Sequence, residues 1–219
     1  MINKQVPDIA AALDGIRDGA TILSAGFGAV GAPDDLLDGL LAMGVRDLVV
    51  VSNNAGSGMR GLAALINAGM VRKVICSFPR TDDPRAFDAA YKAGKIELEL
   101  VPQGIISERM RAAAAGLGGF YSPVGVGTKL ADGKEVREID NKRYVFEKPL
   151  RGDVALLRAH RADRWGNLAY RKSARNFNPV MATAAELTVV QTKQMVELGD
   201  IDPECVHTPG IFVDRVVVV

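Results

Sequence analysis

The chain has 219 residues, of which 48% are hydrophobic, so it is long enough to bury a substantial core in one globular domain. With 27 Lys and Arg against 26 Asp and Glu, the net charge is +1, which argues against a global basic field that would attract nucleic acid or an anionic membrane. The two cysteines, Cys76 and Cys205, lie far apart without a metal-site spacing, which argues against a disulfide framework and fits a reducing compartment. No signal peptide or apolar run of membrane length is recognisable, so we expect a cytoplasmic protein.

The first predicted elements surround a glycine-rich segment. Apolar residues at helical spacing follow Pro7, and Gly19 ends that helix just before a predicted strand at 20–24. The segment 26–31 comes next, and Pro33 stands where a second helix takes its first residue. Such a strand, glycine turn and helix start places free backbone N–H groups close to a ligand. We therefore predict a ligand-binding loop here.

Strands and helices then alternate along the first half of the chain. We predict strands at 47–51, 73–76 and 96–101, and helices at 33–44, 62–68, 84–93 and 105–115. Apolar strands separated by helices of this length predict βαβ crossovers. The expected fold is α/β, with an open, mostly parallel sheet and helices on both faces.

The residue composition changes at the start of the second half. The glycine-rich segment 116–150 predicts a small β-rich insertion within a single domain, 1–219. Asp140-Asn141-Lys142 predicts a hairpin turn within it. The remaining expected elements are a β pair at 154–159 and 167–170, a helix at 180–185, a strand at 187–191 and a final apolar run at 211–219.

The glycine loop also matches a dinucleotide-binding spacing. Gly26, Gly28 and Gly31 form a G-x-G-x-x-G between a predicted strand and helix. That motif also needs an acidic residue after the next strand to bind the ribose, and residues 52–54 are Ser-Asn-Asn. An NAD-dependent oxidoreductase therefore stays a minority alternative, beside a plain tight turn.

Three amide side chains follow predicted strands. Asn53 and Asn54 end the strand at 47–51, and Gln103 follows the strand at 96–101. Carboxyl ends of parallel strands are where an open α/β sheet places its ligand-binding residues. These amides can donate hydrogen bonds to a carbonyl oxygen or a developing oxyanion. They can equally cap helices and turns.

Common nucleophile and metal patterns are weak in this sequence. His160 and His207 are the two histidines, and neither has a second His or Cys at ligand spacing. Ser57 lies in Gly-Ser-Gly, which is not a nucleophile elbow. The densest basic segment, 171–177, either binds a phosphate or carboxylate or forms a solvated or subunit-facing surface.

Residues 18–33, DGATILSAGFGAVGAP, resemble the signature of family I CoA-transferases, of the form DGxxhhhGGFxxxGxP. Further segments are similar, in the same order, to the A subunit of the 3-oxoacid CoA-transferases: residues 52–56, 101–104, 120–128 and 170–177. Other segments look most like family members that act on 3-oxoadipate, and members that act on acetoacetate share most of them.

The resemblance implies the CoA-transferase (NagB-like) fold and transfer of CoA from succinyl-CoA to a 3-oxo acid. We expect 3-oxoadipate, in the degradation of aromatic compounds through the β-ketoadipate pathway, with acetoacetate as the alternative. The implied nucleophile is a glutamate of a separate B subunit, so the expected assembly is a heterodimer or a heterotetramer with two copies of each. A CoA thioester enters as a substrate, and neither a permanent cofactor nor a metal is expected.

The resemblance also implies roles for individual residues. Gln103 would polarise the thioester carbonyl as a supporting catalytic residue, and Asn53 and Asn54 would bind the substrate carboxylate or hold the loop. Two departures from the family pattern occur, because Ala25 replaces a usual Gly and Val126 a common Tyr. The residues that match the CoA loop of the family are Ser24, Ala25, Gly26, Phe27, Gly28, Ala29 and Val30.

Overall fold

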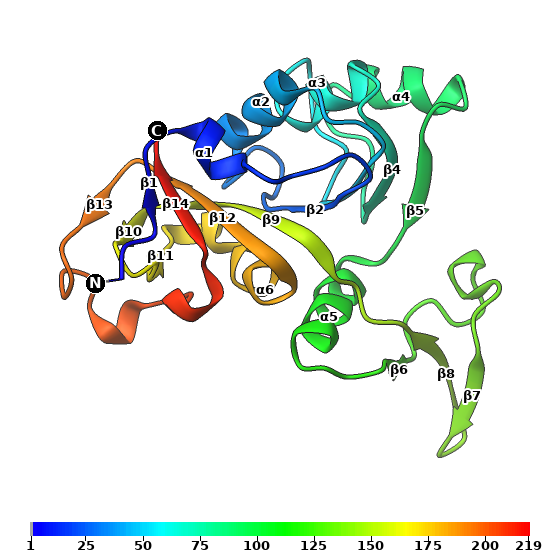
Figure 1. Cartoon of the computed structure of the whole chain (residues 1–219). Helices are drawn as coiled ribbons and strands as arrows, with labels where there is room; N and C mark the ends of the chain where they lie inside the picture. The colour runs from blue at the N-terminus through cyan, green and yellow to red at the C-terminus, as the bar shows by residue number, and fades with distance from the viewer. Residues whose placement is uncertain (1) are drawn as a thin grey trace.

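A computed structural model, which describes residues 2–219, shows an eight-stranded sheet at the centre of the chain (Figure 1). Its strand order is β1-β14-β12-β9-β2-β3-β4-β5, and all neighbouring strands in it run parallel. The bounds are β1 (Gln5–Val6), β2 (Thr21–Ser24), β3 (Leu48–Val51), β4 (Val71–Cys76), β5 (Glu97–Leu100), β9 (Gly152–Ala159), β12 (Ala185–Thr192) and β14 (Arg215–Val218). The predicted parallel sheet is confirmed.

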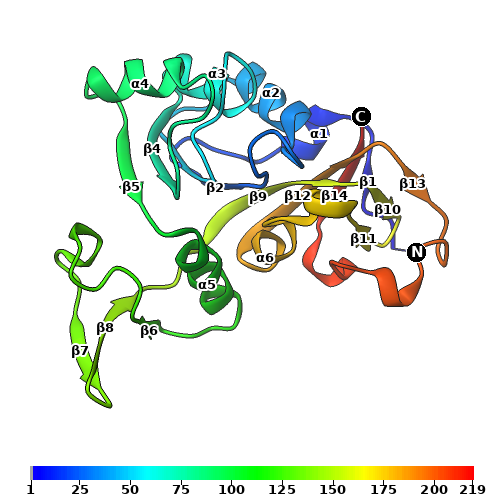
Figure 2. The same ribbon diagram turned by 180° about the vertical axis from the view of Figure 1, so that it is seen from behind.

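Helices cover both faces of this sheet, as Figures 1 and 2 show from opposite sides. One hydrophobic core packs the first four helices on one face, and a second core packs the last two on the other. Because both faces are covered, β3 is apolar and buried along its whole length. The helices are α1 (Ile9–Leu13), α2 (Asp34–Met43), α3 (Leu62–Asn67), α4 (Arg85–Lys92), α5 (Gln103–Ala114) and α6 (Asn178–Thr183).

The ends of α2 follow from its sequence. Asp34 and Asp35 occupy its first turn, where carboxylates stabilise the positive end of the helix dipole. Gly44 ends the helix in the left-handed conformation, with its N–H donating to the Leu40 carbonyl. Leu36, Leu37 and Leu40 form its buried face, and Leu41 is exposed.

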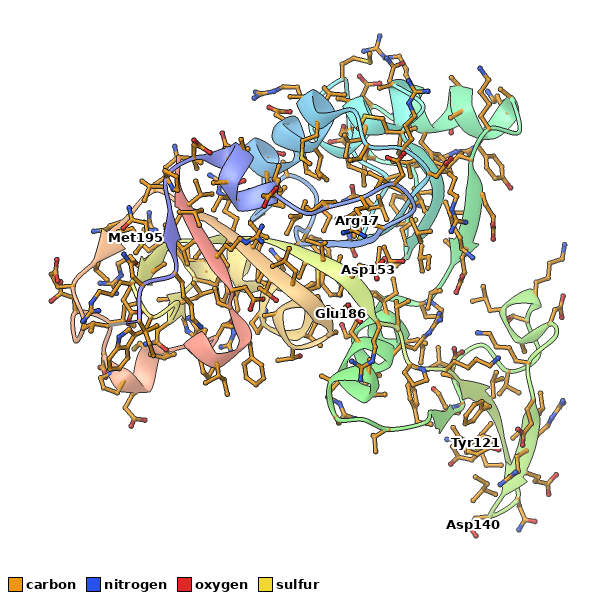
Figure 3. All side chains as sticks on the ribbon, viewed as in Figure 1. Arg17, Tyr121, Asp140, Asp153, Glu186 and Met195 are labelled. Carbon is orange, nitrogen blue, oxygen red and sulfur yellow. The ribbon has the colours of Figure 1, made fainter. Side chains whose placement is uncertain are left out.

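A small antiparallel sheet projects from the main body. Its order is β6-β8-β7, and Tyr121 and Asp140 mark its two ends in Figure 3. The predicted hairpin is confirmed, with positive φ angles at Asp140 and Asn141 as a type I′ turn requires. The strands are β6 (Phe120–Ser122), β7 (Val136–Ile139) and β8 (Lys142–Glu147).

The predicted β pair at 154–159 and 167–170 is wrong. Strand β9 lies between β2 and β12 in the central sheet, because its apolar residues can be buried there on both faces. The turn itself is present, and the Asp163 carboxylate accepts the backbone N–H of Trp165 at 2.9 Å. This turn joins β10 (Arg161–Asp163) to β11 (Leu168–Ala169), and β13 (Met195–Val196) completes a third small sheet.

Candidate functional site

The carboxyl ends of β2 and β9 mark the point where the strand order of the central sheet reverses. From β2 the chain continues through β3, β4 and β5 toward one edge, whereas from β9 it continues through β12 and β14 toward the other. Open α/β sheets bind ligands outside the carboxyl ends of their strands at such a point. The glycine-rich loop leaves β2 at this position.

A tight turn forms the tip of the glycine-rich loop. Phe27 and Val30 exchange backbone hydrogen bonds of 3.0 and 3.2 Å, which leaves Gly28 and Ala29 at the tip. The side chains of Phe27 and Val30 are 52% and 47% exposed. Ala25, at the base of the loop, is buried, and its N–H donates to the Leu156 carbonyl of β9 at 3.1 Å.

The side chain of Asn176 holds the two ends of this loop together. Its Oδ1 accepts the N–H of Gly26 at 3.1 Å, and its Nδ2 donates to the Val30 carbonyl at 3.1 Å. The basic segment 171–177 therefore supports the loop, a role that no local sequence pattern indicates. At Gly31 a side chain has no space, because an added Cβ would lie 2.6 Å from Asn176 Nδ2.

A cavity of about 370 Å³ lies between this loop and the loop that follows β3. Five of the predicted site residues line it: Ser24, Ala25, Gly28, Ala29 and Asn54. Sequence reasoning missed Asp34 and Arg60, which also line it and come from α2 and from the loop before α3. Burial raises the pKa of the Asp34 carboxyl above its ordinary value, and the positive charges of Arg158 and Arg60 oppose this shift.

Asn53 and Gln103 form a direct pair at the carboxyl ends of β3 and β5. Gln103 Nε2 donates to Asn53 Oδ1 at 2.7 Å, and the Ser77 hydroxyl donates to the same oxygen at 3.0 Å. Helix α5 begins at Gln103, two residues before the predicted start, so its backbone fixes this side chain beside β3. Amide N–H groups of this kind are donors that can stabilise an oxyanion.

Asn54 adopts a different role from Asn53. Its Oδ1 accepts the backbone N–H of Gly56 at 2.8 Å, which closes an Asx turn after β3. The turn-capping alternative is therefore realised at Asn54. The residue still lines the cavity, whereas Asn53 and Gln103 lie outside its lining.

Two other candidate groups are unsuited to nucleophilic attack at this site. Burial raises the pKa of the Cys76 thiol to about 12, so the thiolate is scarcely formed at neutral pH. His207 Nδ1 accepts the backbone N–H of Tyr170 at 3.0 Å and stacks on the Tyr170 ring. Within residues 2–219, no cluster of three His, Cys, Asp or Glu side chains is arranged to bind a metal, and none of the helices is long and apolar enough to cross a membrane.

A separate cavity lies at the amino ends of the central strands, on the side of the sheet away from the glycine-rich loop. It is lined by residues at the amino ends of β2, β9 and β12, among them Arg17, Asp153 and Glu186 (Figure 3). The Asp153 carboxylate accepts the N–H of Thr21 at 2.6 Å, which ties the starts of two neighbouring strands. All of the predicted site residues lie at the carboxyl ends of the strands instead.

The sequence of the chain is similar to those of known proteins. A family model described as Coenzyme A transferase matches residues 6–219. The chain is 60% identical over 219 residues to the A subunit of 3-oxoadipate CoA-transferase of Pseudomonas putida, covering 100% of this chain and 95% of that protein. It is 41% identical over 215 residues to the A subunit of succinyl-CoA:3-ketoacid coenzyme A transferase of Helicobacter pylori strain J99, covering 98% of this chain and 92% of the relative.

Solved structures share the fold. Glutaconate coenzyme A-transferase from Acidaminococcus fermentans matches with a TM-score of 0.86 at 22% identity, covering 99% of this chain and 75% of that one. The acyl-CoA transferase YdiF apoenzyme from Escherichia coli O157:H7 matches with a TM-score of 0.85 at 25% identity over 99% of this chain. The present chain spans about half of YdiF, 47% of its length.

Proposed function

The chain belongs to the coenzyme A transferase family, and we propose that it is the A subunit of a 3-oxoadipate CoA-transferase. The enzyme would move CoA from succinyl-CoA to 3-oxoadipate, giving succinate and 3-oxoadipyl-CoA. The observation that carries this proposal is the 60% identity, over the whole chain, to a relative of that name. We place this activity in the cytoplasm and treat residues 1–219 as one functional domain.

The proposed chemistry divides one acyl transfer into exchanges through a covalent carboxylate intermediate. The thioester carbonyl of succinyl-CoA is attacked by a glutamate of the B subunit, which releases the CoA thiolate and leaves a mixed anhydride. The thiolate then attacks the glutamyl carbonyl, so that succinate leaves and a glutamyl-CoA thioester remains. The carboxylate of 3-oxoadipate repeats both exchanges in the reverse sense and regenerates the glutamate. Four easier exchanges thus replace one difficult transfer.

Residues of this chain would bind and polarise the reacting groups. The glycine-rich loop, residues 24–30, would contact CoA through the backbone N–H groups of Gly28 and Ala29 at its tip, because the N–H groups of residues 25–27 and 30 donate within the chain. The pair Asn53 and Gln103 would donate hydrogen bonds to the oxyanion that forms at each carbonyl, and Asn54 would bind the substrate carboxylate from the wall of the cavity. The hydrogen bond of 2.7 Å between Gln103 and Asn53 supports this assignment because it orients both amides.

The face around the site has features of a surface that another chain covers. Phe78 is 64% exposed after β4, and Phe27, Val30 and Met59 are exposed on the neighbouring loops. Exposed apolar side chains gathered on one face commonly mark a protein interface. The relatives' names, which designate one subunit of a pair, also support a separate B subunit. We propose a heterodimer or a heterotetramer with two copies of each subunit.

Reconstitution with a B subunit tests the division of roles. We expect no exchange of CoA by the purified chain and steady turnover after the B subunit is added. Because Asp34 and Asp82 also line the cavity, the acylated side chain must be located. Borohydride reduction of the trapped thioester and peptide mapping should find the label on the B subunit. Turnover by this chain alone, or a label on Asp34 or Asp82, would contradict the assignment.

Substitution of Gln103 tests its supporting role. In the reconstituted enzyme, Gln103→Ala should lower kcat about 100-fold, because one oxyanion donor is removed. Gln5→Ala is a control, since Gln5 is an exposed glutamine like Gln103 but lies on β1, at the opposite edge of the sheet from β5. An unchanged kcat for Gln103→Ala would remove this residue from the mechanism.

The alternative substrate is acetoacetate, which the 41% identity to a succinyl-CoA:3-ketoacid relative supports. Comparison of kcat/KM for the two acids decides between them. The NAD-dependent alternative has lost its basis, since the match to the coenzyme A transferase family model accounts for residues 6–219, including the glycine loop.

A further inference from the structure

A second cavity, of about 340 Å³, lies on the other side of the glycine-rich loop. Ala29 lines both cavities, so only the tip of the loop separates them. The side chains of Arg158, His160, Arg171 and Lys193 line this second cavity, which we call the cationic pocket. Neither the loop motif nor the amide positions in the sequence point to it.

The cationic residues are gathered by the register of the central sheet. Arg158 lies near the end of β9 and His160 directly follows the strand, and both residues line the pocket. Thr192 pairs with Ala159, which places Lys193 beside the end of β9. Arg171 approaches from the basic segment, which the loop-supporting Asn176 also occupies.

These cations have no carboxylate partners in the pocket. Among residues 2–219, Arg158, Arg171 and Lys193 make no ion pair within 4.0 Å, and no Asp or Glu lines the pocket. The Arg158 guanidinium donates to the Ala32 carbonyl at 3.3 Å, and its charge also acts on Asp34 in the neighbouring cavity. In a chain with a net charge of +1, unpaired cations around one cavity indicate a local site for an anion.

We propose that the cationic pocket binds the carboxylate that the acyl substrate keeps free during the reaction. This proposal rests on the proposed function. Succinyl and 3-oxoadipyl groups each carry one carboxylate beyond the reacting carbonyl, whereas an acetoacetyl group carries none. Both acyl groups react in turn at one site, and two carbons in succinyl and four in 3-oxoadipyl separate the free carboxylate from the reacting carbonyl, so different cations of the pocket would bind the two carboxylates. Guanidinium and ammonium groups bind such a carboxylate through charge-assisted hydrogen bonds. The pocket thereby selects dicarboxylic over monocarboxylic acids.

Arg171→Ala and Lys193→Ala test this selectivity in the reconstituted enzyme. Both side chains are exposed, and neither makes a hydrogen bond that supports the glycine-rich loop. The ratio of kcat/KM for 3-oxoadipate to kcat/KM for acetoacetate should fall about tenfold or more in each variant, because a charge-assisted hydrogen bond is lost. The inhibition constant for succinate should rise by a similar factor. Lys92→Ala, which removes an exposed charge at the end of α4, should change neither quantity.

Two further measurements distinguish other sources of the anion. If the pocket holds the 3′-phosphate of CoA, the variants will raise KM for succinyl-CoA but not for succinyl-dephospho-CoA; if it holds the pyrophosphate, they will raise both KM values. In both cases the selectivity ratio will stay constant. If it holds an acidic side chain of the B subunit, the variants will weaken assembly on size-exclusion chromatography. Either result, or variants that behave as the wild type, overturns the carboxylate proposal. A wild-type complex that prefers acetoacetate instead contradicts the proposed function itself, before any variant is compared.

Discussion

Two glycine substitutions in the same loop allow a quantitative test of how the loop is held. Gly31 has a φ of +72°, and an added Cβ would lie 2.6 Å from Asn176 Nδ2 and 2.7 Å from the Ala174 carbonyl oxygen. Gly28 has a φ of +61°, and an added Cβ would find no atom within 4 Å. Alanine at either position would be destabilised by the left-handed backbone conformation. Only at Gly31 would the alanine Cβ also clash with the basic segment 171–177.

The expected destabilisation follows from these contacts. A left-handed non-glycine residue costs about 1–2 kcal/mol, and the less flexible unfolded chain offsets about 0.4–1 kcal/mol of that. We therefore expect Gly28→Ala to lower the free energy of unfolding by about 1 kcal/mol. Crowding against Asn176 and the Ala174 carbonyl adds about 1–3 kcal/mol, so Gly31→Ala should cost about 2–4 kcal/mol.

Thermal and urea unfolding of the two variants and the wild-type chain provide the assay. A difference of about 2 kcal/mol between the variants corresponds to about 4–8 °C in Tm for a chain of this size. The measurement needs neither a substrate nor a partner chain, so it is independent of the proposed function. Equal stabilities for Gly28→Ala and Gly31→Ala would refute the close packing of the loop against the basic segment.

Two further predictions concern the residues around this loop. Asn176→Ala removes both bonds that hold the loop ends, at about 1 kcal/mol each, so urea unfolding should show a loss of about 2 kcal/mol. An exposed control, Asn67→Ala at the end of α3, should show much less. Burial and then the nearby Arg175 charge lower the pKa of His207, so the unfolded chain binds the proton more readily and stability should fall as the pH drops below about 6.5. In urea titrations between pH 5 and 8, His207→Asn should flatten this dependence of stability on pH. The control His160→Asn should retain it. A dependence that persists in His207→Asn would exclude His207 as its source.

Local patterns in the sequence were sufficient for most of the elements and for the loops that form the candidate site. Alternating apolar strands and helices predicted the parallel sheet, because a strand buried on both faces must be apolar throughout. The glycine spacing predicted the loop after β2, and the two asparagines marked the carboxyl end of β3. These features depend on backbone conformation and burial within a few residues. Residue types at short spacings indicate both properties directly.

Sequence patterns failed where the choice lay between two possible partners. Strand β9 is followed by a turn-forming segment, which favoured a hairpin with 167–170, but the central sheet buries β9 more completely than a hairpin could. The run 211–219 is apolar apart from Asp214 and Arg215, and no local pattern indicated what it packs against; Ile211 lies in an exposed 3-10 helix, and Arg215–Val218 forms a strand. Burial by a distant segment decided both cases.

The strand, loop and helix that form the site could thus be read from the amino-acid sequence, and its resemblance to a known family predicted the activity. Which side chains meet at the site depends instead on the folded chain. Asn176 reaches a loop 150 residues earlier in the chain, Gln103 meets an asparagine 50 residues earlier, and the strand ends of β9 and β12 bring the cations together. Such contacts depend on the order and register of strands in the sheet, and strand order follows from burial summed over the whole chain.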